Sequence, residues 1–540
     1  MLRAKRSAAA SLLAILAGCS DESASAVDAT LAPPDGPCVG CDVTRDRPPA
    51  DDADVARIDA SSAPDVAAPS DTSIAAPDIP ASDIPAPDVT ARDVTAPDVT
   101  APDVTARDVA PPMDTGAGPD AGVRPWSPPV EVGAVTFPYR AYRCAHAVRA
   151  VMPDATAARF HAEQFGDAPR PRNLHLTFAG DPATSVVIQW STDEATLSSE
   201  VRFGDRPGVL DRVARGYSFT YAGASGRRQH EVHLCGLDPG RTWHYDVGGG
   251  APGARSPAYH FVTAPDGPSE VTVLVSGDTR SNVAAWNAVT RRALTEGADL
   301  LIFTGDAVEW GGDQGQWDAL FDASPDLWAT TPAVWVHGNH EGLAEPYFAQ
   351  LALADHGGAR GFEQWYALTY GPLRIVALND TVALEEDVTV AQVEFLRAAV
   401  AAVDRTRVPY VLTAHHQPFY TTSLTHPPAS FLRGAWAPVF DALRVNVDLA
   451  GHVHSYESSV PLRGATADLD GVRVPASMGT RYLTFGGGGA DLYDFGDPAP
   501  WLVTRESVHG YGVITASATR LQWVARREDG SPVETIDLLR

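Results

Sequence analysis

Five short apolar runs in this sequence each end in a small residue or a turn that is followed by Asp, Asn or His. The five endings are Gly277-Asp278, Gly305-Asp306, Gly338-Asn339-His340-Glu341, His415-His416-Gln417-Pro418 and Gly451-His452-Val453-His454. One such ending is more often a turn or a structural pair, but chance rarely assembles all five in order. Carboxylate and amide oxygens combined with imidazole nitrogens suit Fe, Mn or Zn rather than Ca. The series therefore predicts a metal site.

The elements that position these residues are predicted to be buried strands that alternate with helices. The apolar runs before the five endings are Val271–Ser276, Leu300–Thr304, Pro332–Val336, Val408–Ala414 and Val447–Ala450. Helix-like stretches lie at Val283–Glu296 and near Val390–Ala402. This alternation predicts α/β layers, in which functional groups gather at the carboxyl ends of strands.

The segment before these layers shows a different pattern, in which short apolar or alternating runs are separated by turn residues. The runs are Asn173–Phe178, Ser185–Trp190, Glu200–Gly204, His230–Leu234 and Thr242–Val247. Their length and spacing predict an all-β sandwich of roughly 95 residues. A sandwich by itself indicates no function, because unrelated functions share this architecture.

The ordered series GD, GD, GNHE, HHxP and GHxH resembles the calcineurin-like metallophosphoesterase superfamily. Together with His230–Tyr245 (HEVHLCGLDPGRTWHY) and Phe261–Pro265 (FVTAP), it is most similar to purple acid phosphatases with an N-terminal fibronectin-III-like domain. The resemblance covers residues 172–540 and implies an α+β/β fold class. It implies a fibronectin-III-like β-sandwich at 172–265 and a metallophosphoesterase αββα sandwich at 270–540. The implied reaction is hydrolysis of a small phosphate ester by an acid phosphatase-like phosphomonoesterase.

The resemblance also implies two metal ions, drawn from Fe, Mn and Zn, which would activate water and neutralise the phosphoryl group during in-line attack. Asp306 would bridge the two ions. The first ion would also be held by Asp278 and His454, and the second by Asn339, His416 and His452.

Two histidines need a further argument. His340 would be the catalytic residue that faces the substrate, where it stabilises the phosphate or protonates the leaving oxygen. His415 and His416 are both candidates for the ligand after the fourth run. The ligand in the family lies two residues before a proline, and Pro418 sets that frame in favour of His416.

Two positions depart from the family pattern. Arg280 stands where superfamily members often have the histidine of Asp-x-His. Glu309 stands three residues after Asp306, where purple acid phosphatases have the tyrosine that gives the ferric charge-transfer colour. Glu309 or water could complete the coordination of the first ion. Because the tyrosine is absent, we expect that the protein is not purple. Arg280 could contact a substrate phosphate bidentately or pair with a nearby acid.

Two other functions are compatible with these residues. One is a phosphodiesterase or nucleotidase of the same superfamily, which would differ in its pocket loops. The other is a binding lipoprotein whose catalytic domain has decayed at Arg280 and Glu309. We favour an enzyme because His340 and the three ligands of the second ion are all present.

The charge of the chain restricts its partners. Its 540 residues carry a formal net charge of −27, and residues 20–124 contain 21 Asp and Glu against 6 Arg. Nucleic-acid binding needs a basic face that displaces counterions from phosphates, so this function is excluded. The same charge favours small phosphate esters over polyanionic substrates.

Residues 1–19 predict a lipoprotein signal peptide. Lys5 and Arg6 precede an apolar run that is too short to span a bilayer, and residues 16–19 (LAGC) resemble a bacterial lipobox. We therefore expect an exported bacterial lipoprotein at the cell envelope, on the outer membrane or facing the periplasm. Its only membrane contact would be the lipid on Cys19. A cleaved signal with a chance cysteine is the alternative.

Residues 20–125 predict a disordered linker rich in Pro, Asp and Ala. Aspartate recurs every 5 residues from Asp78 to Asp108, in units such as Ala-Pro-Asp-Val-Thr. The repeat has no aromatic residue and cannot bury enough apolar surface to fold, while proline and like charge keep it extended. We interpret it as a spacer, followed by an irregular lead-in at 126–171.

The remaining cysteines are expected to form disulfides, because export exposes thiols to an oxidising compartment. Cys38 and Cys41 have C-x-x-C spacing with no second pair nearby, which favours a local disulfide over a zinc or redox site. Cys144 and Cys235 can pair if the lead-in folds back on the sandwich.

If the repeat is only a spacer, deleting Ser61–Pro119 should leave the turnover of a soluble substrate unchanged. Steady-state kinetics of the deletion variant and the full chain provide the comparison. A large change in the catalytic rate would mean that the repeat contacts the folded domains.

Overall fold

The computed structural model describes residues 126–148, 156–224, 226–280, 282–356, 363–381 and 386–538, all of which belong to one structural unit. The predicted signal peptide with Cys19, the predicted linker and the Cys38–Cys41 pair lie outside the described residues. Within the described ranges, no helix combines the length and apolar character that crossing a membrane requires.

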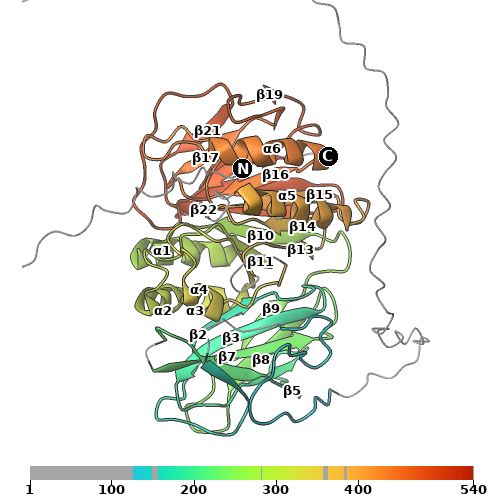
Figure 1. Cartoon of the computed structure of the whole chain (residues 1–540), viewed down its shortest axis with the longest axis vertical. Coiled ribbons are helices and arrows are strands. Elements are labelled where there is room, and N and C mark those ends of the chain that lie inside the picture. The colour runs from blue at the N-terminus through green and yellow to red at the C-terminus, as the bar shows by residue number, and fades with distance from the viewer. Residues whose placement is uncertain are drawn as a thin grey trace, which may run out of the picture. The chain divides into compact units, whose positions relative to one another are not determined.

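The predicted sandwich is present and consists of two antiparallel sheets (Figure 1). One sheet has the order β1 (Thr156–Phe160), β6 (Tyr217–Thr220), β7 (Arg227–Cys235), β3 (Ser185–Asp193) and β2 (Arg172–Thr177). The other has the order β5 (Arg212–Arg215), β4 (Glu200–Gly204), β8 (Thr242–Gly248) and β9 (Tyr259–Val262). Trp190 and Trp243 are buried in its core. The likeness to fibronectin III in particular stays a prediction.

The predicted irregular lead-in needs a correction, because β1 lies within it. Thr156, Arg159 and Phe160 of β1 pair with β6 at the edge of the first sheet. The lead-in is also tied to the sandwich by a disulfide between Cys144 and Cys235, whose Cα atoms are 5.0 Å apart. The proposed pairing of these two cysteines is therefore present.

Two mixed sheets follow the sandwich. The six-stranded sheet has the order β12 (Ala333–Trp335), β11 (Leu300–Phe303), β10 (Val271–Ser276), β22 (Gly510–Ala516), β23 (Leu521–Arg527) and β24 (Pro532–Asp537). The seven-stranded sheet has the order β13 (Tyr366–Tyr370), β14 (Leu373–Ala377), β15 (Tyr410–Ala414), β16 (Val447–Ala450), β20 (Arg481–Phe485), β17 (Tyr456–Ser459) and β21 (Leu502–Glu506). A ribbon joins β18 (Leu462–Arg463) to β19 (Val472–Arg473).

Helices cover these sheets on their outer sides. They are α1 (Val283–Ala293) with the 3-10 turn η1 (Leu294–Glu296), α2 (Gln314–Ala323), α3 (Pro325–Thr330), α4 (Glu345–Gln350), α5 (Glu386–Ala401) and α6 (Ser430–Leu443). Alternate residues of β15 pack into two different hydrophobic cores. Val411 packs into the core that contains Leu396 of α5 and Trp436 of α6, whereas Leu412 packs into the core shared with the six-stranded sheet. The predicted order helix, sheet, sheet, helix is therefore observed (Figure 1).

The sandwich and the sheets behind it share a hydrophobic core, so the sandwich is not a loosely tethered module. The Tyr245 hydroxyl of β8 donates to the carbonyl of Ala329 in α3 over 2.7 Å. The Asp318 carboxylate of α2 accepts a hydrogen bond from Asn173 at 2.6 Å and forms an ion pair with Arg227 of β7. This junction fixes α2 and the loop before it against the sandwich.

Two aspartates of α2 allow a direct measurement of this junction. Asp318 is 11% exposed and pairs with Arg227, whereas Asp322 is 54% exposed and pairs with Arg172. Asp318→Asn should lower the free energy of unfolding by about 3 kcal/mol, because it removes a buried carboxylate and leaves a partly buried guanidinium without its counter-charge. Asp322→Asn should cost less than about 1 kcal/mol, because water screens that pair.

Denaturant unfolding of both variants makes this comparison. Equal losses for the two variants would show that burial does not determine the strength of the junction.

Candidate metal centre

The parallel strands bring the predicted site residues to one edge of each sheet. Strands β10, β11 and β12 are parallel, so Asp278, Asp306 and Asn339 follow carboxyl ends on the same side. Strands β15 and β16 are also parallel, so His416 and His452 leave the seven-stranded sheet on one side. Ligand sites in layered α/β folds form at such carboxyl ends.

The backbone of the site is strained. Of the described non-glycine residues, seven have a positive φ, and four of these lie in this site: Asp278 (60°), Arg280 (40°), Asp306 (54°) and His452 (64°). Each such conformation costs on the order of 1–3 kcal/mol and persists where the surrounding structure enforces it. Strain collected in one place indicates a functional site.

Four donor atoms converge around the His416 imidazole. Its Nε2 lies 3.0 Å from Asn339 Oδ1, 3.2 Å from His452 Nδ1 and 3.3 Å from Asp306 Oδ1. His416 Nδ1 donates to the carbonyl of Thr304 over 2.8 Å, so Nε2 presents a lone pair to the other three donors. Donors about 2.1 Å from a common ion lie roughly 3 Å from one another. This set therefore fits a transition metal ion.

A second, smaller set of donors lies beside Asp306. Asp278 Oδ1 accepts from the backbone N–H of His452 at 2.8 Å and lies 3.7 Å from His454 Nε2. His454 Nδ1 donates to the carbonyl of Asp491, which directs Nε2 toward Asp278. The buried Oδ2 of Asp278 has no hydrogen-bond partner among the described residues. An orphaned buried carboxylate oxygen fits a cation site.

His340 lies beside the bridging aspartate. Its backbone N–H donates to Asp306 Oδ1 at 3.0 Å, and its side-chain Nδ1 donates to the carbonyl of Glu309 at 2.9 Å. The remaining ring atom, Nε2, lies 3.8 Å from Asp306 Oδ2, on a side chain that is 21% exposed. The predicted catalytic histidine therefore directs Nε2 toward the donor cluster.

His415 is occupied elsewhere. Both of its ring nitrogens are bound, Nδ1 to Asp380 at 3.1 Å and Nε2 to Asp448 at 3.0 Å, and the side chain is fully buried. Burial alone would lower the pKa of His415, but Asp448 and Asp380 raise it to about 9, so the ring is an imidazolium. Both ring nitrogens of His415 are thus held by carboxylates away from the cluster, whereas Nε2 of His416 faces Asn339, His452 and Asp306.

Sequence reasoning missed several residues of the site, among them Glu341 and His426. Glu341 accepts backbone N–H groups from Asp306 (3.0 Å), Ala307 (2.7 Å) and Gly338 (2.8 Å), and so joins the second and third loops. His426 stacks beside His452 with ring centroids 4.2 Å apart. Glu341 is the last residue of the GNHE motif, but the motif predicted no role for it. His426 belongs to none of the five motifs, so nothing in the sequence indicated that it lies at the site.

The two departures from the family pattern contact each other. Arg280 Nε donates to Glu309 Oε2 at 3.0 Å, and Arg280 Nη2 donates to Glu309 Oε1 at 2.8 Å. Of the two roles considered for Arg280, the structure therefore shows the salt bridge. The carboxylate of Glu309 faces this guanidinium.

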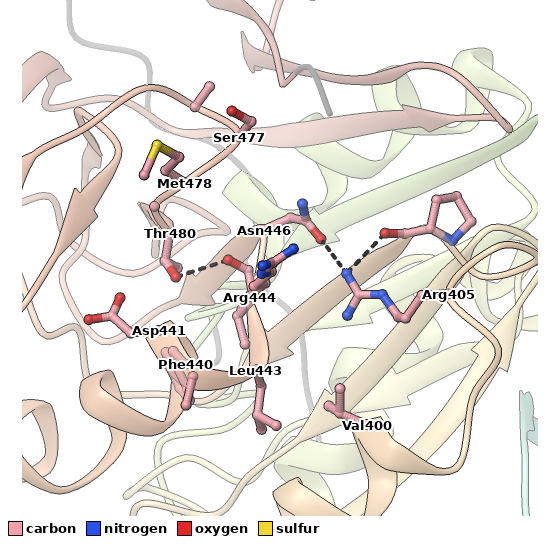
Figure 2. A pocket seen from close by; sticks show the side chains of 15 residues that line it. Val400, Arg405, Phe440, Asp441, Leu443, Arg444, Asn446, Ser477, Met478 and Thr480 are labelled. Atoms are coloured by element: carbon pink, nitrogen blue, oxygen red, sulfur yellow. Dashed lines mark hydrogen bonds between the residues drawn. The ribbon is translucent and has the colours of Figure 1, made fainter.

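A cavity of about 450 Å³ lies at the amino ends of β15, β16 and β20, opposite to the carboxyl ends that carry His416 and His452 (Figure 2). Its lining includes Pro409, Asn446 and Thr480, which precede β15, β16 and β20. Asn446 Oδ1 accepts from the backbone N–H of Val411, and Thr480 donates to the carbonyl of Val445. These polar side chains satisfy backbone groups at the amino ends of the strands. We therefore do not expect the cavity to be the catalytic site.

Comparison with known proteins agrees with this geometry. The model of the purple acid phosphatase N-terminal domain matches residues 171–263, and that of the calcineurin-like phosphoesterase matches residues 271–456. Purple acid phosphatase 18 of Arabidopsis thaliana is 24% identical over 66% of this chain and 82% of the relative. The Fe(3+)-Zn(2+) purple acid phosphatase 12 of the same plant is 24% identical over 67% of this chain and 82% of the relative.

A solved structure shows the same fold. The purple acid phosphatase from yellow lupin seeds superposes with a TM-score of 0.59 at 18% identity, over 69% of this chain and 74% of the lupin chain.

Glu341 provides a test of how the loops hold the donors. Glu341→Gln replaces one acceptor oxygen by an amide that cannot accept from the backbone N–H groups, so it should weaken metal binding about 10- to 100-fold. Titration of the metal-free protein with Zn²⁺, followed by calorimetry, measures this affinity. Glu345→Gln is the matched control, because Glu345 accepts from the backbone N–H of Ala222 in the sandwich and is not among the residues of the donor cluster. A wild-type affinity for Glu341→Gln would contradict the role of this carboxylate.

Proposed function

We propose that this chain, a purple acid phosphatase-like metallophosphoesterase, hydrolyses small phosphate monoesters with two metal ions. The observation that carries the proposal is the convergence of Asp306, Asn339, His416 and His452 around one point, with Nε2 of His340 directed toward it. This arrangement combines a transition-metal donor set with a side chain that can exchange a proton.

Asp306, Asn339, His416 and His452 would hold one ion, and Asp278, Asp306 and His454 the other. When bound, such a pair of ions polarises the phosphoryl group and lowers the pKa of a bound water. Imidazole and carboxylate donors suit Fe, Mn and Zn, and the name of one relative specifies Fe(3+) and Zn(2+). The charge of Asp306 supports a bridging role. Burial would raise its pKa, but His416 and His340 lower it below the ordinary value.

His340 would act on the leaving oxygen. Its Nδ1–H is fixed on the carbonyl of Glu309, so Nε2 is the atom that exchanges a proton with the ester. A proton on Nε2 could pass to the leaving oxygen as the ester bond breaks.

We place the enzyme at the bacterial cell envelope as a lipid-anchored protein, on the strength of the lipobox-like residues at 16–19. Cys19→Ser should shift the protein from the membrane fraction to the soluble fraction, because the cysteine would be the only lipid-bearing residue. Cell fractionation with immunoblotting measures the shift. A soluble wild-type protein would contradict the anchor.

Asp306 and Asp299 allow a matched test of the proposed activity, because they flank the same strand, β11. Asp306→Asn should lose bound metal and lower kcat/KM by about 10³-fold or more, since the bridging charge is removed. Asp299 accepts from the backbone N–H of Thr272 at the opposite end of the strand, so Asp299→Asn should retain metal and activity.

The assay is a screen of monoesters and diesters, with Fe, Mn and Zn supplied in turn and metal content measured by mass spectrometry. Faster hydrolysis of diesters would support a phosphodiesterase or nucleotidase instead. Two bound ions without hydrolysis of any ester would contradict an enzymatic role, and an active Asp306→Asn variant would contradict the bridging assignment.

A further inference from the structure

The salt bridge between Arg280 and Glu309 joins the two positions at which the site departs from its family pattern. The two residues are 29 positions apart in the sequence and meet through two parallel hydrogen bonds of 3.0 and 2.8 Å. Such a bidentate pair fixes both the position and the plane of the guanidinium. The structure thus holds an oriented cation where the family pattern has neutral or metal-binding groups.

The pair is built directly onto the catalytic loops. The backbone N–H of Arg280 donates to the carbonyl of Asp306 at 3.2 Å, so the backbone of Arg280 lies beside the proposed bridging residue. The backbone carbonyl of Glu309 accepts from His340 Nδ1 at 2.9 Å, and Glu309 Oε1 lies 3.8 Å from the same nitrogen. The guanidinium is therefore separated from the His340 ring by a single carboxylate.

Arg280 remains within reach of a ligand. Its side chain is 21% exposed, and besides the two hydrogen bonds to Glu309 it makes a side-chain hydrogen bond with Tyr493. Its backbone has a φ of 40°, in the same left-handed region as Asp278 and Asp306. Backbone strain at a residue beside the donor cluster is typical of functional positions.

The charges around the site explain what this cation can bind. Asp278, Asp306, Glu309 and Glu341 contribute acidic groups, whereas the substrate brings a phosphoryl dianion into the same space. Arginine presents a rigid fork of donors that matches phosphate oxygens, and in a partly buried site it binds them more strongly than a hydrated ammonium would.

We propose that Arg280 binds the phosphoryl oxygens of the substrate and of inorganic phosphate, and that Glu309 positions it for this contact. The proposal rests on the phosphatase function proposed above and identifies a binding residue on the side of Asp278 and His454. Glu309 acts through Arg280 and does not bind metal.

The test uses the metal-loaded full chain and inorganic phosphate as the probe. Calorimetry measures the Kd for phosphate, which requires no turnover, and mass spectrometry measures bound metal. Arg280→Ala should raise this Kd about 10- to 100-fold, since it removes charge-assisted hydrogen bonds, with the metal content unchanged. Arg280→Lys should fall between wild type and Arg280→Ala, because it retains the charge and loses the fork.

Glu309→Gln should raise the Kd less, by about 3- to 10-fold, because the guanidinium remains but loses its anchor. In the Arg280→Ala background, Glu309→Gln should have no further effect, which a merely structural role would not produce. The matched control is Arg407→Ala. Arg407 pairs with Asp266 at 2.7 Å before β15, at the end of the sheet away from the site. The phosphate Kd of Arg407→Ala should therefore equal that of wild type.

The outcomes separate this proposal from the proposed function. Phosphate binding that is unchanged in Arg280→Ala, or absent in wild type, would overturn the role of Arg280. Loss of a metal ion in Glu309→Gln would overturn its positioning role and make it a metal ligand. If wild type binds phosphate through Arg280 but hydrolyses no ester, the binding residue stands and the phosphatase function fails.

Discussion

Buried carboxylates that accept backbone N–H groups hold the loops of this site together. Glu341 accepts from the loops after β11 and β12, Asp278 accepts from His452 after β16, and Asp380 binds both His415 and the N–H of Gln417 after β15. Burying a carboxylate costs several kcal/mol unless hydrogen bonds or a cation compensate. Each carboxylate therefore stabilises the fold only when the loops lie in their observed positions, so the two sheets and the donor cluster form together.

The sandwich contributes to the same arrangement from outside. Its contacts with α2 and α3 hold the segment that runs from Asp306 through Glu309 to the first helical turn of α2, and Gln316 of that helix accepts from the backbone N–H of Glu309. The position of Glu309, and through it that of Arg280, thus depends on packing between two domains. A β-sandwich that supplies none of the donor residues therefore takes part in shaping the site.

The sequence predicted the strands that lead into the site because their apolar runs are short and most of them end at a glycine. Val271–Ser276 and Val447–Ala450 agree residue for residue with β10 and β16. Strand β1 was missed because it lies at a sheet edge and carries no apolar alternation. The roles of Asp380 and Asp448 could not be predicted, since only the folded chain brings both against His415. His416 was separated from His415 by family pattern alone, whereas the structure supplies a physical reason.

The contact between Arg280 and Glu309 also constrains how this site can change over generations. A sequence that alters only one of the two positions leaves a charged group without its counter-charge beside the donor cluster, which is costly in a partly buried place. The two positions are therefore expected to have changed as a pair, or through an intermediate of reduced stability. In a set of close homologues, arginine at the first position should accompany an acidic residue at the second, so that the pair marks a lineage more sharply than any donor residue does.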